Sequence, residues 1–214
     1  DARKAENISD EKLEECLGLI ESFIVRRSVC GVPTNALNKL FIQWCKNFPE
    51  TTPETDYVQW LRDALGADGA SRRFPRDAEF TGAFLDQPQY GRRTTRFILC
   101  RLEQSFEHKE TVDLTTTTIE HVLPQTLNQQ WKDSLGAEAE ETHHTLLNTF
   151  GNLTLTGYNS ELGNLPFIDK KIKLHNTHIE LNRSVLEQDQ WGSEEIRNRA
   201  KQMLSQATDI WPEP

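Results

Sequence analysis

The sequence predicts an α+β fold that is mostly helical, with a helical first half and a small β structure in the second half. From Ile8 to about Glu110, apolar residues recur every three or four positions, which is the period of an amphipathic helix. From Thr111 two segments have the β-branched or alternating character of strands, and the helical period then returns. We therefore expect a helical support region over residues 1–110 and a second region over residues 111–214.

The first half is expected to form a series of helices. Ser9 can cap the first helix, which should end before Gly31. Its expected buried face carries Leu13, Leu17, Ile20 and Ile24. Further helices are marked by apolar spacing in the segments 37–44, 55–65, 75–84 and 97–106. The simplest interpretation of this half is a helical bundle that supports another part of the protein.

The second half is expected to run strand, excursion, strand, helix. DLTTTTIEHV and GNLTLT are the two strands, and the polar segments LNQQWKDSL and EAEETHHTLLNTF between them suit helices. GYNSELGNLPFIDKKIKL should begin with a helical turn, break at Gly163 and Asn164, and restart after Pro166. A C-terminal helix should follow, because Ile196, Ala200 and Leu204 share one face.

Composition narrows the class of protein. The chain has 214 residues, of which 36% are hydrophobic and 27% are charged, which is typical of a soluble globular protein. No apolar run reaches membrane-spanning length, and the charged start is not a signal peptide. The 4 cysteines form no CxxC pair, so a zinc ribbon is not expected. Each cysteine sits among apolar residues, as a buried thiol would, which favours a reducing, cytoplasmic compartment. The chain lacks an initiator Met, so we expect it to be a piece of a longer protein.

An acid and an imidazole stand side by side in TTTTIEHVLPQ. Glu120 and His121 end the first expected strand, shortly before Pro124. Neighbours on a strand point to opposite faces, but at a strand end both side chains can approach one site. Imidazole suits the role of general base because its pKa lies near neutral pH. A carboxylate together with asparagine oxygens, which GNLTLTGYNSELGN supplies, would suit Mg²⁺.

These blocks carry a family resemblance. TIEHVLPQ and FGNLTLTGYNSELGNLPFIDKKIKL resemble the HNH (His-Me finger, ββα-metal) nucleases. More closely, they are similar to the C-terminal nuclease domain of GmrSD-type modification-dependent restriction endonucleases. IESFIVRRSVCGVPTNALNK and FPRDAEFTGAFLDQPQYG resemble the helical region that precedes that nuclease. The resemblance implies a ββα-metal nuclease core followed by C-terminal helices, acting as the DNA-cutting effector of an antiviral defence protein in the bacterial cytosol.

The resemblance also implies a role for each matching residue. His121 would be the general base, and Glu120 would hold a metal ion where many relatives have an Asp. Asn152 would pin the loop between the strands, and Asn159 would be a further metal ligand of the catalytic set. The expected ion is Mg²⁺ or Mn²⁺. The cysteine-bound zinc of some relatives is not expected.

The expected substrate is DNA, cut with little sequence preference because such a site contacts phosphate rather than bases. The net charge of −9 argues against a broad phosphate-binding surface. Any DNA contact should therefore be local, in small basic clusters, or supplied by the missing part of the protein. The resemblance implies that Lys170 and Lys171 lie where a cation could meet the scissile phosphate. Lys173 and Asn164 are the further candidates for contact with DNA. The resemblance further implies that an N-terminal NTPase-like domain, outside this sequence, senses modified phage DNA and mediates any oligomer.

Each assignment has a structural alternative. His121 could be a core histidine, Glu120 a surface or capping acid, and the lysines a solvated face. His143 and His144 lack visible metal partners and are expected at the surface. Two other functions also stay open, namely a degenerate nuclease fold that only docks DNA or a partner, and an RNase on the same fold.

Overall fold

The computed structural model describes residues 8–49, 52, 55–66, 72–106, 108 and 112–214. The chain forms two compact units. The first comprises the residues up to Phe80 together with Trp211–Pro214, and the second comprises Thr81–Ile210. The mostly helical α+β class is confirmed, with one 2-stranded sheet among the described residues. The predicted support region, residues 1–110, and second region, residues 111–214, differ in role and stay a prediction. The compact units divide after Phe80 and concern packing only.

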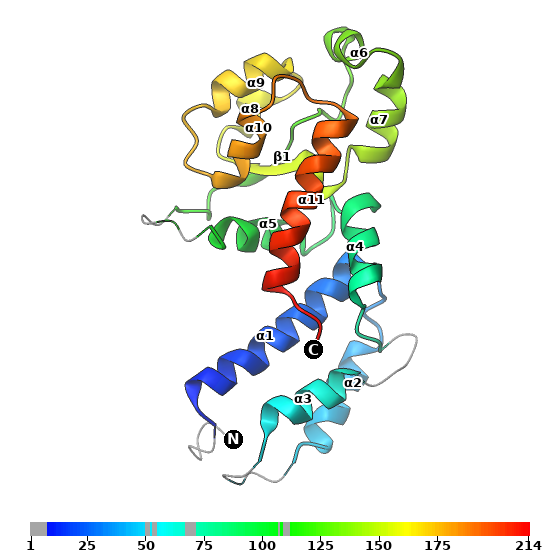
Figure 1. Cartoon of the computed structure of the whole chain (residues 1–214), viewed down its shortest axis with the longest axis vertical. Helices are drawn as coiled ribbons and strands as arrows, with labels where there is room; N and C mark the ends of the chain where they lie inside the picture. Colours follow the sequence, from blue (N-terminus) through cyan, green and yellow to red (C-terminus); the bar gives the residue numbers. More distant parts are fainter. Residues whose placement is uncertain (1–7, 50–51, 53–54, 67–71, 107, 109–111) are drawn as a thin grey trace. The chain divides into compact units, whose positions relative to one another are not determined.

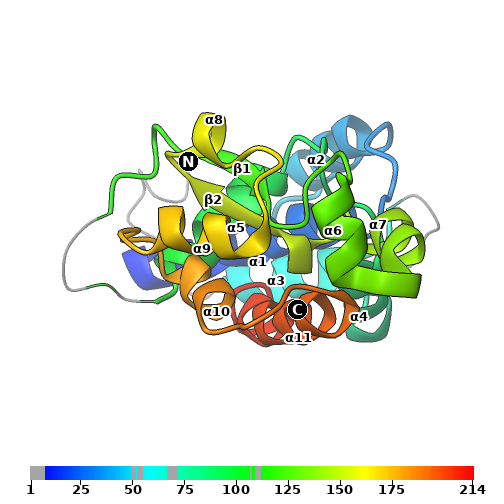
Figure 2. The same ribbon diagram turned by 90° about the horizontal axis from the view of Figure 1, so that it is seen from above.

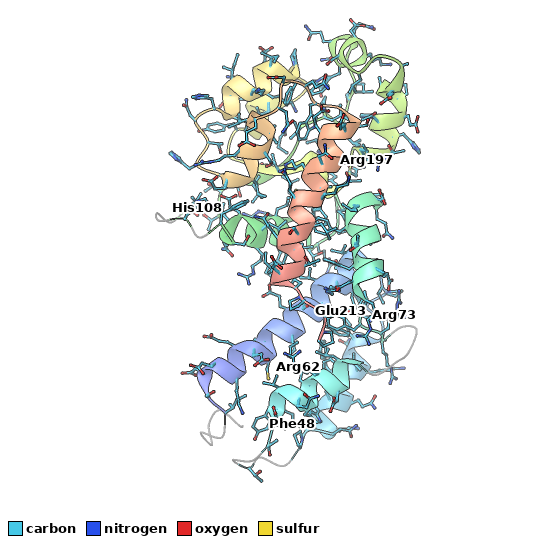
Figure 3. All side chains as sticks on the ribbon, in the orientation of Figure 1. Phe48, Arg62, Arg73, His108, Arg197 and Glu213 are labelled. Atoms are coloured by element: carbon cyan, nitrogen blue, oxygen red, sulfur yellow. The ribbon has the colours of Figure 1, made fainter. Side chains whose placement is uncertain are left out.

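The first unit contains the helices expected from the apolar spacing, namely α1 (Asp10–Val29), α2 (Leu37–Lys46) and α3 (Tyr57–Gly66). Ser9 caps α1 as predicted, since its side chain accepts a hydrogen bond from the backbone N–H of Lys12. These helices surround a core made of Leu19, Phe23, Leu40, Val58, Leu61, Leu65 and Phe74. Arg62 of α3, which is labelled in Figure 3, is near the surface. It pairs with Glu15 of α1 at 2.8 Å.

The predicted buried face of α1 is partly wrong. Leu17 is 57% exposed, while Leu19 and Phe23 are buried. Apolar residues occur on more than one face of this helix, and these faces lie next to each other around its axis. The face that meets α2 and α3 becomes the core, and the spacing within α1 alone does not show which face that is.

The second unit contains the expected strand, excursion, strand, helix order. α4 (Asp77–Asp86) contains the division between the units, and the later elements follow in chain order: α5 (Thr95–Gln104), β1 (Thr118–His121), α6 (Gln129–Leu135), η1 (Gly136–Glu138), α7 (Ala139–Leu146), η2 (Phe150–Asn152), β2 (Leu153–Thr156), α8 (Asn159–Leu162), α9 (Phe167–Leu174), η3 (Glu180–Asn182), α10 (Arg183–Leu186) and α11 (Ser193–Ile210). α8, α9 and α10 lie toward one side of the unit and α6 and α7 toward the other (Figure 1, Figure 2). No helix in the described part of the chain is long and apolar enough to cross a membrane.

β1 is shorter than the β-branched run that predicts it. Asp113 accepts hydrogen bonds from both the backbone N–H and the hydroxyl of Thr115, and the hydroxyl of Thr117 donates to the Leu114 carbonyl. These local side-chain bonds stabilise a turn and compete with strand pairing. Pairing therefore begins at Thr118, which lies opposite Thr156 in the antiparallel register.

A buried arginine fixes the start of β2. The Arg199 guanidinium, on α11, donates hydrogen bonds to the carbonyl oxygens of Phe150, Gly151, Leu153 and Leu181. Burial lowers the pKa of Arg199 to about 10. By satisfying buried carbonyl oxygens of η2, of η3 and of the first residue of β2, this side chain holds these segments against α11.

Gly151 allows η2 to approach α11 closely. A methyl group at this position would lie 2.2 Å from the Ile196 carbonyl oxygen and 3.0 Å from the Ala200 Cβ. Because the nearer atom belongs to the helix backbone, it cannot rotate away. We expect Gly151→Ala to destabilise the protein by at least about 1–3 kcal/mol, the usual cost of overpacking. A methyl group at Gly157 would have no atom within 4 Å. Gly157→Ala is therefore the matched control in thermal melts, and an equal melting temperature for both variants would contradict this account.

Candidate active site

His121 ends β1 in a buried position, with 5% of its surface exposed. Its Nε2 lies 3.1 Å from Oδ1 of Asn148, which is in the turn between α7 and η2. The Tyr90 ring packs edge-on against the imidazole, with ring centroids 4.3 Å apart. The imidazole is therefore held by a polar partner from one segment and an aromatic ring from another.

The surroundings of His121 keep it neutral. Burial lowers its pKa below the ordinary value, and the nearby Lys170 and His143 lower it further, while the contact with Asn148 acts in the opposite direction. His143 itself contacts the Pro124 carbonyl oxygen at 3.1 Å through Nε2. A neutral imidazole at physiological pH has a free lone pair and can accept a proton, which is the requirement for a general base.

Glu120 faces a different partner. Its Oε1 lies 2.6 Å from Nζ of Lys170 on α9, and Lys170 also donates to the His121 carbonyl oxygen at 2.7 Å. Lys170 is 0% exposed, and Glu120 is buried too. Burial raises the pKa of Glu120 and lowers that of Lys170, and in each case the attraction of the partner opposes the effect of burial. The two residues form a buried ion pair beneath the end of β1.

Glu120 and His121 were expected to approach one site, but among the described residues the structure gives their side chains no shared partner. The two side chains have separate partners, Lys170 for Glu120 and Asn148 for His121. Adjacent strand residues point to opposite faces. Glu120 and His121 are both buried, so both faces are covered at the end of β1.

Asn152 uses its side chain to hold the chain after β1. Its Oδ1 accepts from the Leu123 N–H at 2.7 Å and from the Trp191 indole N–H at 3.0 Å. Its Nδ2 donates to the carbonyl oxygens of Leu123 and Leu147, each at 2.9 Å. Asn152 is fully buried. This is the arrangement that a loop-pinning residue requires, and it leaves no side-chain donor or acceptor free for a substrate.

The described residues do not fit a divalent cation in this arrangement. Glu120 is the carboxylate proposed as a ligand, and the Lys170 ammonium already occupies its Oε1. Asn159 begins α8, but its side chain lies outside the described residues. No group of at least 3 His, Cys, Asp or Glu within the described part of the chain is arranged to hold a metal ion. Mg²⁺ is usually bound in proteins through one or two carboxylates together with waters and substrate phosphates. The obstacle to a cation at Glu120 is therefore the Lys170 ammonium, and not the number of protein ligands.

A model of the C-terminal domain of GmrSD restriction endonucleases matches residues 74–206. The chain belongs to this family. The match includes the strand pair, His121 and the turn that carries Asn148. Membership in a restriction endonuclease family implies nuclease activity, with DNA as the substrate. No match was found among curated proteins. The likeness of IESFIVRRSVCGVPTNALNK, residues 20–39, to the family's upstream helical region lies outside the matched range and stays a prediction.

The residues of this GmrSD domain that were predicted to contact DNA differ from one another in burial and in hydrogen-bond partners. Lys170 is in the interior, so the prediction that it meets DNA at the surface needs correction, and so does its alternative, a solvated face. The half-buried Lys171 donates to the Gln188 carbonyl oxygen, and the exposed Lys173 pairs with Glu161 at 3.0 Å. Asn164 is exposed, and its carbonyl oxygen accepts a hydrogen bond from Asn128. The heptapeptide FIDKKIK therefore contributes one buried, one half-buried and one exposed lysine.

The GmrSD domain also has neighbours of His121 that the sequence analysis missed. Tyr90 lies in the PQYG loop, where Pro and Gly indicate a turn but nothing indicates a ring contact with a residue far along the chain. Asn148 lies in EAEETHHTLLNTF, the segment for which the sequence predicts a helix. His143 was expected at the surface, yet it is half-buried and bonded to Pro124. An Asn directly after a helix is a common turn signal, and that is the only hint the sequence offers for Asn148.

Proposed function

We propose that this domain is an endonuclease that cuts DNA phosphodiester bonds with little sequence preference, as the effector of a modification-dependent restriction system. The observation that carries the proposal is a neutral, buried imidazole at a strand end, with His121 held by Asn148 and Tyr90, in a member of the GmrSD family. His121 accepts a proton from water as the water oxygen bonds to phosphorus, and the bond from phosphorus to the 3′ oxygen breaks. The leaving 3′ oxygen takes a proton from solvent. Asn152 keeps the chain after β1 in place during this step.

Dependence on Mg²⁺ or Mn²⁺ and the HNH type of site are further parts of the proposal, and they rest on the resemblance of the motifs. The ion pair between Glu120 and Lys170 stands against a simple metal site. We derive no catalytic step through a metal ion for this reason. The proposed sensing of modified phage DNA by a separate NTPase-like domain likewise rests on the resemblance.

The test is a cleavage assay with the full chain, measured on supercoiled plasmid and on structured RNA. Each substrate is incubated with Mg²⁺, with Mn²⁺ or with a chelator. We expect nicked or linear plasmid and intact RNA, with product only when a divalent cation is present. Cleavage of RNA alone would replace the proposal with the RNase alternative. Binding of plasmid without cleavage under all conditions would favour a docking module.

A further inference from the structure

Asn148 has a fixed position beside His121. Its backbone carbonyl oxygen accepts hydrogen bonds from the backbone N–H groups of Gln89, at 2.7 Å, and Tyr90, at 3.2 Å. Gln89 is itself buried and donates through its side chain to the Ala83 carbonyl oxygen at 3.1 Å. The same loop that presents the Tyr90 ring to His121 therefore also anchors the backbone of Asn148.

The His121 ring is restrained from several directions. Its backbone carbonyl accepts from Lys170 at 2.7 Å, its ring edge meets Tyr90, and its Nε2 meets the side chain of Asn148. Among the described residues, Nδ1 has no hydrogen-bond partner, and it is not fully buried. The two ring nitrogens are thus in different environments, one bonded within the protein and the other open to a proton donor.

From this geometry we infer that Asn148 is the positioning residue for His121, and that it selects which ring nitrogen acts as the base. A neutral imidazole carries a single N–H, and the side-chain oxygen of an asparagine can only accept. The contact of Nε2 with Oδ1 therefore places the proton on Nε2 and leaves the lone pair on Nδ1. The inference rests on the proposed function for its consequence, because only a reaction needs Nδ1 as the proton acceptor.

The proton position is measured directly by nuclear magnetic resonance on the full chain labelled with ¹⁵N-histidine. Spectra are recorded about two pH units above the ordinary histidine pKa, where the ring is neutral. The His121 signals are those that disappear in His121→Ala. We expect a protonated Nε2, an unprotonated Nδ1, and an N–H proton that exchanges slowly with water because it is buried and bonded.

Asn148→Leu tests the partner, because it keeps a similar volume and removes the acceptor. The Nε2 proton signal should be lost to exchange, and cleavage should fall roughly 10- to 100-fold, the range typical of residues that orient a functional imidazole. Asn176→Leu is the matched control, since Asn176 is an exposed asparagine that contacts another histidine, His175. It should leave the His121 signals unchanged.

Asn148→Asp keeps the inference testable if Asn148→Leu does not fold. A carboxylate is a stronger acceptor than an amide oxygen, so the Nε2 proton should remain visible and move downfield. A proton on Nδ1 in the parent protein, or an unchanged Nε2 signal in Asn148→Leu, would overturn the inference. So would parent-level cleavage by Asn148→Leu. A parent protein that cleaves nothing would instead defeat the proposed function, and the spectra would still decide on the contact.

Discussion

Replacing His121 with alanine should abolish detectable DNA cleavage while the protein stays folded. Removal of a general base typically costs about 10²- to 10⁴-fold in rate, which is enough to eliminate product in a plasmid assay. His121 lies at the end of β1, and its ring contacts are to a Tyr90 that is 42% exposed and to Asn148. The loss of packing should therefore be modest.

The measurement is the rate of plasmid nicking by His121→Ala, together with its thermal melt. His144→Ala is the control, because His144 is an exposed histidine on the neighbouring helix α7. It should cleave like the parent protein. If His121→Ala also cleaved like the parent, His121 would have a structural role only and the nuclease mechanism proposed above would be wrong.

Replacing Lys170 with methionine should destabilise the protein by roughly 3–5 kcal/mol, the usual cost of leaving one member of a buried ion pair without its partner. Glu120 would lose the ammonium at 2.6 Å, and the His121 carbonyl would lose its donor. The double variant Glu120→Leu, Lys170→Met should recover most of this loss, because replacing both charges with apolar groups is often neutral. Chemical denaturation of both variants and the parent gives the comparison.

The loss in Lys170→Met should also depend on pH. In the parent, burial raises the pKa of Glu120, and Lys170 opposes part of that rise. Without Lys170 the effect of burial remains, so the folded-state pKa of Glu120 should lie above its unfolded value. A carboxyl of this kind costs stability above its unfolded pKa, and the cost disappears as the pH falls and the group becomes neutral. The destabilisation should therefore be smaller at acidic than at neutral pH.

A further variant, Glu120→Gln, decides between two roles for Glu120. If Glu120 is the counter-ion of Lys170, Glu120→Gln should lower stability, and excess Mn²⁺ should not restore cleavage. If Glu120→Gln melts like the parent and excess Mn²⁺ restores its cleavage, Glu120 acts as a metal ligand as the sequence resemblance implies. The second result would mean that the ion pair must open before the domain becomes active.

The sequence by itself determined the longer helices and the order of the two strands, because these depend on local periodicity and on residues that begin or end elements. Ser9 starts α1, and the break at Gly163 and Asn164 separates α8 from α9, as the sequence predicts. The motif around His121 also led to the family to which the chain belongs, since a motif is a local feature.

Only the tertiary structure decided which partners surround His121 and Glu120. Asn148 and Tyr90 meet His121 from positions far apart in the chain, and Lys170 reaches Glu120 across 50 positions. From the sequence, a lysine in a charged run is expected to be solvent-exposed. Its neighbours in the chain do not show that the Glu120 carboxylate and the His121 carbonyl oxygen accept hydrogen bonds from Lys170 in the interior. Burial and pairing depend on contacts between distant segments, and such contacts have no local period that a sequence pattern can reveal.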